Sequence, residues 1–299
     1  MTALTTSRPV TTAPTATARR RSMRRRLSRR VSLLLTAIVA LVFSAPVLYL
    51  VIGSLKPSNQ VLDGMSGLKP SGLSLRNYSG VINQFDSGAT GHFSNFYLTS
   101  LTVSGAVVIG GLIVNSVAGY ALARLRWRGR KLMLLAVIAL VILPFQAIAV
   151  PLFYLLDGAR DTVYVQFLPF IASAFSIFLF YSFFVGLPKE FEEAAAIDGA
   201  GPWRTMLTIV MPNSKPVFAS VAILSFLTSW SSFLWPVMMV DQPGVSPLPL
   251  QIAVFQGQTP VNWGEVCAFG VLMVAPVVLV FIAFQRWFVQ GVTASAVKG

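Results

Sequence analysis

The stretch EAAAIDGA, residues 193–200, lies between two long apolar runs and is followed directly by GPWRTMLTIVMP, residues 201–212. Glutamates at its start suit the positive N-terminal end of a helix. Gly199 supplies a residue that adopts a left-handed backbone and ends that helix, and Pro202 is well placed to begin another. The pattern predicts a hairpin of two short helices that turns at an Asp-Gly pair.

Both helices of this predicted hairpin have an apolar or small-residue face. The residues at helical spacing are Phe191, Ala194, Ala195 and Asp198 in the first helix and Trp203, Met206, Leu207 and Val210 in the second. Alanines allow a partner backbone to approach closely, and an apolar face needs something to cover it. Two coverings remain open: a cytoplasmic protein that docks on the hairpin, or the chain's own helices.

The composition indicates that the rest of the chain lies in lipid. Of its 299 residues, 55% are hydrophobic and only 11% are charged, whereas soluble domains carry about 25% charged residues. A membrane-spanning helix needs roughly 20 mostly apolar residues. Six runs meet that requirement, at residues 31–53, 96–123, 132–156, 164–186, 217–240 and 265–288. We therefore predict an all-α integral membrane protein with six transmembrane helices over residues 31–288, including a hairpin loop at 187–216.

Prolines fall inside these runs, at Pro46, Pro144, Pro151, Pro169, Pro236 and Pro276. A proline removes one backbone hydrogen bond, and neighbouring helices must satisfy the freed group. Such breaks suit a bundle that moves, but proline is also common in membrane helices.

The positive charge is distributed unevenly. The formal net charge is +13, and most of the Lys and Arg fall in residues 1–30, 124–131, 187–216 and the C-terminal end. Cytoplasmic segments of membrane proteins carry this excess, so both termini are expected in the cytoplasm. Residues 1–30 form a basic tail that we expect to be disordered until it meets anionic lipid, and residues 289–299 form a second cytoplasmic tail. This distribution argues against a nucleic-acid partner.

Specific motifs resemble a known family. The order EAA, three residues, Gly, nine residues and then Ile-x-Met-Pro is similar to the EAA loop of ABC-importer permeases, with Met211 where that pattern has Leu. Further matches to the carbohydrate-uptake subgroup, and to the smaller permease of maltose-type systems, are Ser54-Leu55-Lys56-Pro57, Asn77-Tyr78, Tyr120 to Arg124, Gly129-Arg130, Leu143-Pro144, Pro151-Leu152 and the C-terminal Gly291 to Gly299.

The resemblance implies a type I ABC-importer permease architecture in a bacterial or archaeal plasma membrane. The implied partners are a second, larger permease, two ATPase subunits and an extracytoplasmic binding protein that delivers a sugar or sugar derivative. The hairpin would then be the coupling element seated on the ATPase. Its implied site residues are Glu193, Ala194, Ala195, Asp198, Gly199, Trp203, Ile209 and Pro212.

The chain is not expected to be an enzyme. A phosphate-binding loop needs a Gly-Lys-Ser/Thr sequence, and none of the six lysines follows a glycine. ATP and magnesium therefore belong on the partner ATPase, and this chain is expected to bind no cofactor. One histidine, His92, and one cysteine, Cys267, cannot make a zinc site, so no metal site is expected.

The spans offer neutral polar groups instead of charges. Asp, Glu, Lys and Arg are missing from their interiors, although Glu265 and Arg286 lie at the ends of the last one. Amides, hydroxyls and aromatic faces can bind sugars, and the candidates for the translocation path are Asn115, Gln146, Ser229 and Trp230. Such residues also serve packing alone. The subgroup has Asn where this chain has Thr99 and Ser231, which loses an amide at each position.

Three functions compete at this point. The first is a permease subunit of an ATP-driven sugar importer. The second is a secondary carrier or channel working alone, although such carriers generally use buried ionisable groups or ion-coordinating broken helices. The third is a membrane scaffold that recruits a cytoplasmic partner through the hairpin without transport.

Overall fold

The computed structural model describes residues 16–64, 72–85, 91–257 and 259–296, and these form helices without a β-strand. The α-helices are α1 (Ala16–Ser54), α2 (Ser58–Val61), α3 (Arg76–Asn83), α4 (Phe93–Ala123), α5 (Arg130–Ile142), α6 (Phe145–Leu156), α7 (Val163–Phe167), α8 (Ala174–Val185), α9 (Glu190–Ile197), α10 (Pro202–Thr205), α11 (Met211–Asn213), α12 (Lys215–Trp230), α13 (Leu234–Met239), α14 (Ile252–Gln256) and α15 (Trp263–Ala296). The 3₁₀ turns are η2 (Asp157–Ala159), η3 (Leu168–Phe170), η5 (Pro243–Val245) and η6 (Leu248–Gln251), and η4 (Met206–Val210) is a π-turn.

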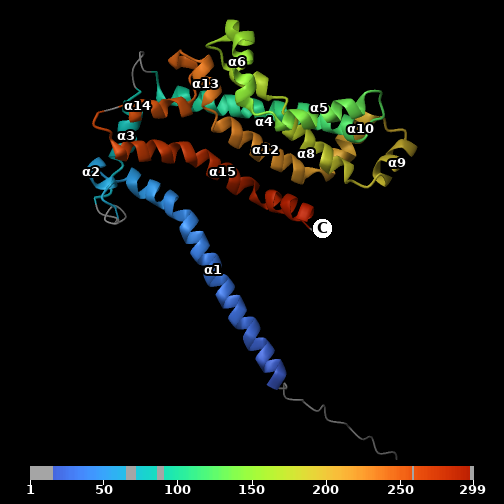
Figure 1. The fold of residues 1–299 in the computed structure, drawn as a ribbon, viewed down its shortest axis with the longest axis horizontal. Helices are drawn as coiled ribbons and strands as arrows, with labels where there is room; N and C mark the ends of the chain where they lie inside the picture. Colours follow the sequence, from blue (N-terminus) through green and yellow to red (C-terminus); the bar gives the residue numbers. More distant parts are fainter. Residues whose placement is uncertain (1–15, 65–71, 86–90, 258, 297–299) are drawn as a thin grey trace, which may run out of the picture.

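A bundle of four helices forms the body of the protein (Figure 1). Helix α4 packs against α8 and α12, and α12 packs in turn against α15. The approach of α4 to α8 is close at Gly119, where an added Cβ atom would lie 2.5 Å from the Cβ of Phe180. Small residues bring membrane helices together in this way, because no solvent-driven force operates between helices in lipid.

The membrane spans fall into two kinds. Residues 31–54 of α1, all of α4 and residues 263–285 of α15 are single helices long and apolar enough to cross a membrane. Three further helix pairs qualify only when each is counted as one bent span, so the described residues hold three to six candidate spans. The run at 132–156 is not one straight helix, because the chain bends by 102° between α5 and α6, at one of the prolines expected to interrupt the spans.

Proline causes that bend. Leu143 precedes Pro144 and adopts an extended backbone, with φ −73° and ψ 119°, because the proline ring disfavours the helical conformation in the residue before it. Pro46, Pro151 and Pro276, in contrast, lie within continuous helices. The run 164–186 is likewise divided into α7, η3 and α8, and the run 217–240 into α12 and α13.

Helix α1 touches the bundle only along part of its length. Its C-terminal end packs against α15, and the rest diverges from the bundle (Figure 1). Apolar side chains on it are exposed, with Phe43 at 78% and Leu41 at 65%. The helix begins at Ala16, so residues 16–30 of the tail that was expected to be disordered are helical here. An existing helix extends at little cost through residues such as Ala and Arg. Residues 1–15 lie outside the described residues.

The C-terminal segment that was expected to be a cytoplasmic tail from residue 289 is helical as far as the structure describes it. Helix α15 continues to Ala296, whereas its candidate membrane span ends at Gln285. In Figure 1 this end of α15 points toward the end of the bundle where α9 lies.

Candidate functional site

The backbone of residues 195–200 forms the predicted hairpin turn. Gly199 has φ +73°, and two hydrogen bonds close the end of α9 around it: Gly199 N–H donates to the Ala196 carbonyl at 3.1 Å, and Ala200 N–H to the Ala195 carbonyl at 2.9 Å. This pair of bonds is the Schellman ending of a helix. Asp198 lies at the exposed C-cap beside it.

The second arm begins at Pro202, as predicted, but it continues past the expected limit at Pro212. Residues 202–213 form one helical arm that contains the π-turn η4, in which Met211 N–H donates five residues back to the Met206 carbonyl. Pro212 has no N–H to continue the α-helical pattern. The chain then bends by 81° into α12, at Ser214, whose hydroxyl donates to the Val210 carbonyl at 2.6 Å.

Each of the two expected faces is split between the bundle and the surface. Ala195, Met206 and Val210 are buried, at 4%, 2% and 2% exposure. Trp203 is 64% exposed and Leu207 57%. Of the remaining residues expected in the coupling site, Ile209 is half-buried and the exposed ones are Glu193, Ala194, Asp198, Gly199 and Pro212. The chain's own helices therefore cover one side of the hairpin and leave an apolar side open.

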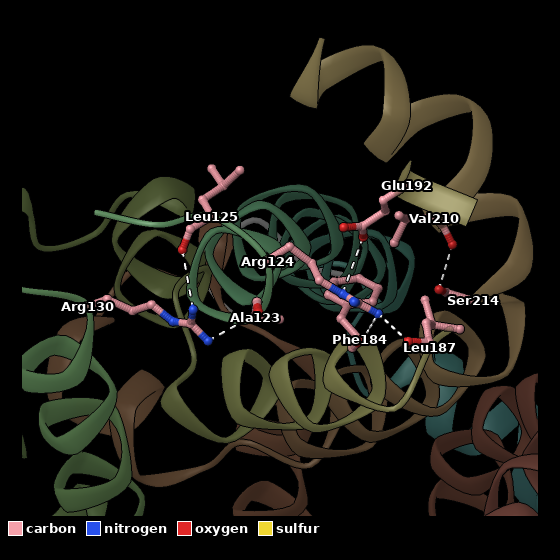
Figure 2. A network of polar contacts seen from close by, with 9 residues as sticks. All are labelled: Ala123, Arg124, Leu125, Arg130, Phe184, Leu187, Glu192, Val210 and Ser214. Carbon is pink, nitrogen blue, oxygen red and sulfur yellow. Dashed lines mark hydrogen bonds and ion pairs between the residues drawn. The ribbon is translucent and has the colours of Figure 1, made fainter. Parts of the chain in front are cut away.

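The side chain of Arg124 joins the hairpin to the bundle (Figure 2). Its Nη2 atom donates to the carbonyls of Phe184 and Leu187, at 2.6 Å each. Its Nε atom lies 3.3 Å from Oε1 of Glu192, and the Arg124 side chain is only 6% exposed. Sequence reasoning assigned Arg124 to the basic turn that faces the cytoplasm and missed this role. The sequence did contain a signal for this role, because Arg124 follows directly after a span and ends the motif Tyr120 to Arg124 that the resembled family shares.

A second arginine of the same turn supports the end of α4. Arg130 donates to the carbonyl of Ala123 at 3.1 Å and to that of Leu125 at 3.5 Å (Figure 2). Helices end with unsatisfied carbonyls, and a cation there is also favoured by the helix dipole. The basic turn 124–131 thus fixes the backbone as well as carrying charge.

A cavity of about 670 Å³ opens among the helices of the bundle. The helices that line it are α4, α6, α7, α8, α12 and α13, together with segments around η3 and η6. Gln146, Ser229 and Trp230, three of the four residues expected on the translocation path, lie on its wall. Its size falls within the range of about 300–1,000 Å³ that is typical of small-molecule pockets.

Asn115, the fourth expected path residue, is placed elsewhere. Its side chain is 1% exposed, and its amide bridges the gap between η3 and α8. Nδ2 donates to the Ile171 carbonyl at 3.0 Å, and Oδ1 accepts from the Ser173 N–H at 3.0 Å. An amide can serve both a donor and an acceptor, so Asn115 satisfies the backbone where the helix is interrupted.

Two tryptophans brace the cavity wall. Trp235 is fully buried and donates from Nε1 to the Val165 carbonyl at 2.9 Å. That carbonyl would be the helical partner of residue 169, which is a proline and cannot donate. Trp230 is 2% exposed, and its Nε1 donates to the Met273 carbonyl of α15 at 2.9 Å. The indole N–H groups of both are therefore already used.

The two positions at which the subgroup has asparagine lie apart from the cavity. Ser231 is exposed and donates to the Leu227 carbonyl at 2.7 Å within its own helix. Thr99 is buried at 8% exposure. The neighbouring Ser100 and Ser232 line the cavity instead.

A helical bundle that encloses a cavity and carries a well-defined hairpin at one end defines a membrane-embedded transport subunit. Comparison with known proteins agrees: the family described as "Binding-protein-dependent transport system inner membrane component" matches residues 111–294. The chain belongs to this family. It is a multi-pass membrane permease component of a binding-protein-dependent transport system, which confirms the resemblance to ABC-importer permeases.

Individual relatives cover nearly the whole chain. The arabinooligosaccharides transport system permease protein AraQ of Halalkalibacterium halodurans is 32% identical, over 88% of this chain and 94% of its own length. The trehalose/maltose transport system permease protein MalG of Thermococcus litoralis is 30% identical, over 91% and 98%. The sn-glycerol-3-phosphate transport system permease protein UgpE of Brucella abortus is 28% identical, over 87% and 93%.

A solved structure shows the same fold. It is the crystal structure of a bacterial ABC transporter involved in the import of the acidic polysaccharide alginate. The matched chain superposes with a TM-score of 0.74 at 24% identity, covering 88% of this chain and 97% of that one.

Proposed function

We propose that this chain is one permease subunit of an ATP-driven importer for an uncharged sugar or sugar derivative. The observation that carries the proposal is the cavity wall. Its lining residues include glutamine, serine, threonine and aromatic side chains, and none of those given by the described residues is Asp, Glu, Lys, Arg or His. Hydroxyls and amides hydrogen-bond sugar hydroxyls, and aromatic rings pack on apolar ligand surfaces.

The relatives carry cargoes of both kinds, neutral and charged. AraQ and MalG belong to systems named for arabinooligosaccharides and trehalose/maltose, whereas UgpE is named for sn-glycerol-3-phosphate and the solved importer for acidic alginate. An anion in a low-dielectric site needs paired positive charge or several donors. The uncharged lining of this cavity favours the neutral cargoes.

The open side of the hairpin supports the rest of the assembly. Trp203, Leu207 and Ile197 are exposed, with Ile197 at 87%, and an apolar cytoplasmic surface of this kind suits a docked protein. We assign it to the ATPase subunits, which bind ATP and magnesium and hydrolyse the ATP. A second, larger permease and an extracytoplasmic binding protein complete the importer. We further propose six spans, an even number that leaves both termini on one side, which the positive-inside rule assigns to the cytoplasm of a bacterial or archaeal cell.

The test is reconstitution of the importer. The chain is purified in mild detergent with its associated polypeptides, placed in vesicles with ATP on the hairpin side, and supplied with the binding protein on the other. Uptake of radiolabelled trehalose, maltose and arabinotriose is compared with uptake of glycerol 3-phosphate and oligomannuronate. We expect ATP-dependent uptake of a neutral sugar. Uptake without ATP would instead support the lone carrier, and a partner bound without uptake would support the scaffold.

A charge placed in the cavity tests its part in the path. Gln146→Glu puts a carboxylate on the wall, and Gln256→Glu makes the same change at an exposed position on α14. A carboxylate on the wall of a path through the membrane is unfavourable, so we expect Gln146→Glu to lower neutral-sugar uptake by about tenfold or more at pH 7. Equal uptake by the two variants would remove this cavity from the path.

A further inference from the structure

The helices that line the cavity converge on the hairpin. Helices α4, α8 and α12 all contribute to the wall. Helix α12 is joined to the hairpin through Ser214 and α8 through the short segment 186–189, whereas α4 ends at Ala123 and has no direct chain connection to the hairpin. Residue Val103, on the cavity wall, lies 21 residues along the chain from Arg124, which corresponds to about 30 Å of helix.

Arg124 supplies the connection for α4 and also holds the end of α8. It is the C-cap residue of α4, its guanidinium holds the carbonyls of Phe184 and Leu187 at the end of α8, and it faces Glu192 of α9 (Figure 2). The planar guanidinium offers donors in fixed directions, which a lysine ammonium does not.

The charges are also placed where the helix dipoles favour them. The guanidinium lies at the negative C-terminal end of α8, and Glu192 lies in the first turn of α9, at its positive N-terminal end. The pair is largely screened from water, with the two side chains 6% and 23% exposed. Solvent therefore weakens this ion pair less than it weakens one on the surface.

Helix α9 has few other anchors to the bundle. Six of its eight residues are exposed; Ala195 is buried and Glu192 half-buried. Ala195 contributes one methyl group, whereas Glu192 forms an ion pair with a buried cation, at 3.3 Å and without hydrogen-bond geometry. Among the described residues, Glu192 is thus the polar side chain through which α9 is held in orientation.

We propose that Arg124, paired with Glu192, is a positioning residue that makes α4 follow the hairpin and α8 when they move. The proposal rests on the proposed function of the hairpin as the coupling element. The ion pair transmits the movement of α9 to α4, and the two carbonyl contacts hold the end of α4 against the end of α8. Without the pair, α12 and α8 still move with the hairpin through the chain, but α4 follows it less closely.

The first experiment measures the ratio of sugar imported to ATP hydrolysed. Glu192→Gln and Arg124→Gln are compared with the wild type in the reconstituted complete importer, with trehalose, maltose and arabinotriose as probes. The matched control is Glu190→Gln, which removes the same charge from an exposed position on the same helix. We expect the ratio to fall by about fivefold or more in both test variants, while the ATPase still co-purifies, and the control to stay near the wild type.

The double variant tests whether Arg124 and Glu192 act through one shared interaction or independently of each other. If the two side chains act through each other, Arg124→Gln/Glu192→Gln is no worse than Arg124→Gln alone. If the two single variants' losses in the import ratio instead multiply in the double variant, the side chains act independently and the proposed link between them is overturned.

The second experiment needs no cargo. Spin labels are placed at Ala196→Cys on α9 and Ile113→Cys on α4, both exposed, in a Cys267→Ser chain. If α4 follows the hairpin, ATP leaves the distance between the labels unchanged in the wild-type complex. Adding Glu192→Gln then broadens or shifts the distance, and adding Glu190→Gln does not.

The outcomes distinguish this proposal from the proposed function. A wild-type complex without an ATPase, or without ATP-driven uptake, refutes the importer. If the wild-type importer is driven by ATP but the test variants keep its import ratio and label distance, only the proposed Arg124–Glu192 link is refuted. Loss of the ATPase from the test variants during purification also refutes it, because the pair then serves assembly and not transmission.

Discussion

Gly199 shows how a single residue determines the shape of the hairpin. Its φ of +73° lies in the left-handed region, where a residue with a Cβ atom is strained by roughly 1–2 kcal/mol. Gly201, two residues on, has φ −73° and open space around its Cα. The two glycines therefore form a matched pair in which only the first requires glycine.

We predict that Gly199→Ala disturbs the hairpin and that Gly201→Ala does not. The strained turn destabilises the native ending of α9 by about 1 kcal/mol, so α9 and α10 no longer hold their relative angle. Transport by the reconstituted importer is measured for both variants, together with ATPase retention on purification. We expect Gly199→Ala to fall several-fold below Gly201→Ala in transport. Equal rates would mean that the turn has no part in coupling.

At the scale of elements, the close contact between α4 and α8 depends on Gly119. A methyl group there would meet the Phe180 Cβ at 2.5 Å and the Tyr181 backbone nitrogen at 3.1 Å, whereas Gly105 of the same helix has nothing within 4 Å. Alanine is otherwise the better helix former by about 0.5–1 kcal/mol. The substitution should thus have opposite effects at the two positions.

We predict that Gly119→Ala lowers the stability of the purified protein by about 1–3 kcal/mol, because α4 and α8 must separate to admit the methyl group. Gly105→Ala should be neutral or slightly stabilising. Thermal unfolding of both variants in the same detergent, followed by the fluorescence of the buried tryptophans, measures the difference. A Gly119→Ala midpoint at or above that of the wild type would contradict the close packing.

The elements also show what the sequence reveals and what it does not. The turn at Gly199 and the start at Pro202 follow from local backbone chemistry, and both were predicted. Pro144 was one of six prolines expected to interrupt the spans, but its 102° bend could not be singled out, because the prolines inside α1 and α15 leave those helices continuous and local chemistry does not separate the cases. Asn115 was placed on the path since it is an amide in a span, but its partners are more than 50 residues away.

Arg124 illustrates the same limit at the level of the site. Its contact with Glu192 joins residues 68 positions apart, and it forms only because α4 and α8 end side by side. Charge counting explains why an arginine lies in the turn 124–131, but not why this one is buried. Interactions fixed by the chain's immediate neighbours could be predicted, and those fixed by packing could not.

At the scale of the whole molecule, the charge pattern and the hairpin make one joint prediction about orientation. The hairpin and the basic turn 124–131 meet at Arg124, so they must lie on the same side of the membrane. The turn at residues 157–162 joins the other ends of two bent spans and carries Gly158, which has open space around it. The positive-inside rule assigns the first group to the cytoplasm and the second to the outside.

We predict that Ile197→Cys and Arg128→Cys react with a membrane-impermeant maleimide only in inside-out vesicles, and Gly158→Cys only in right-side-out ones, all in a Cys267→Ser chain. Docked ATPase should protect Ile197→Cys and leave Arg128→Cys reactive, since only the former lies on the open side of the hairpin. Labelling of Ile197→Cys and Gly158→Cys from one side would exclude an odd number of spans between them. It would also contradict the proposed coupling, because the ATPase on the hairpin must lie on the opposite side of the bilayer from the side where the binding protein delivers the sugar.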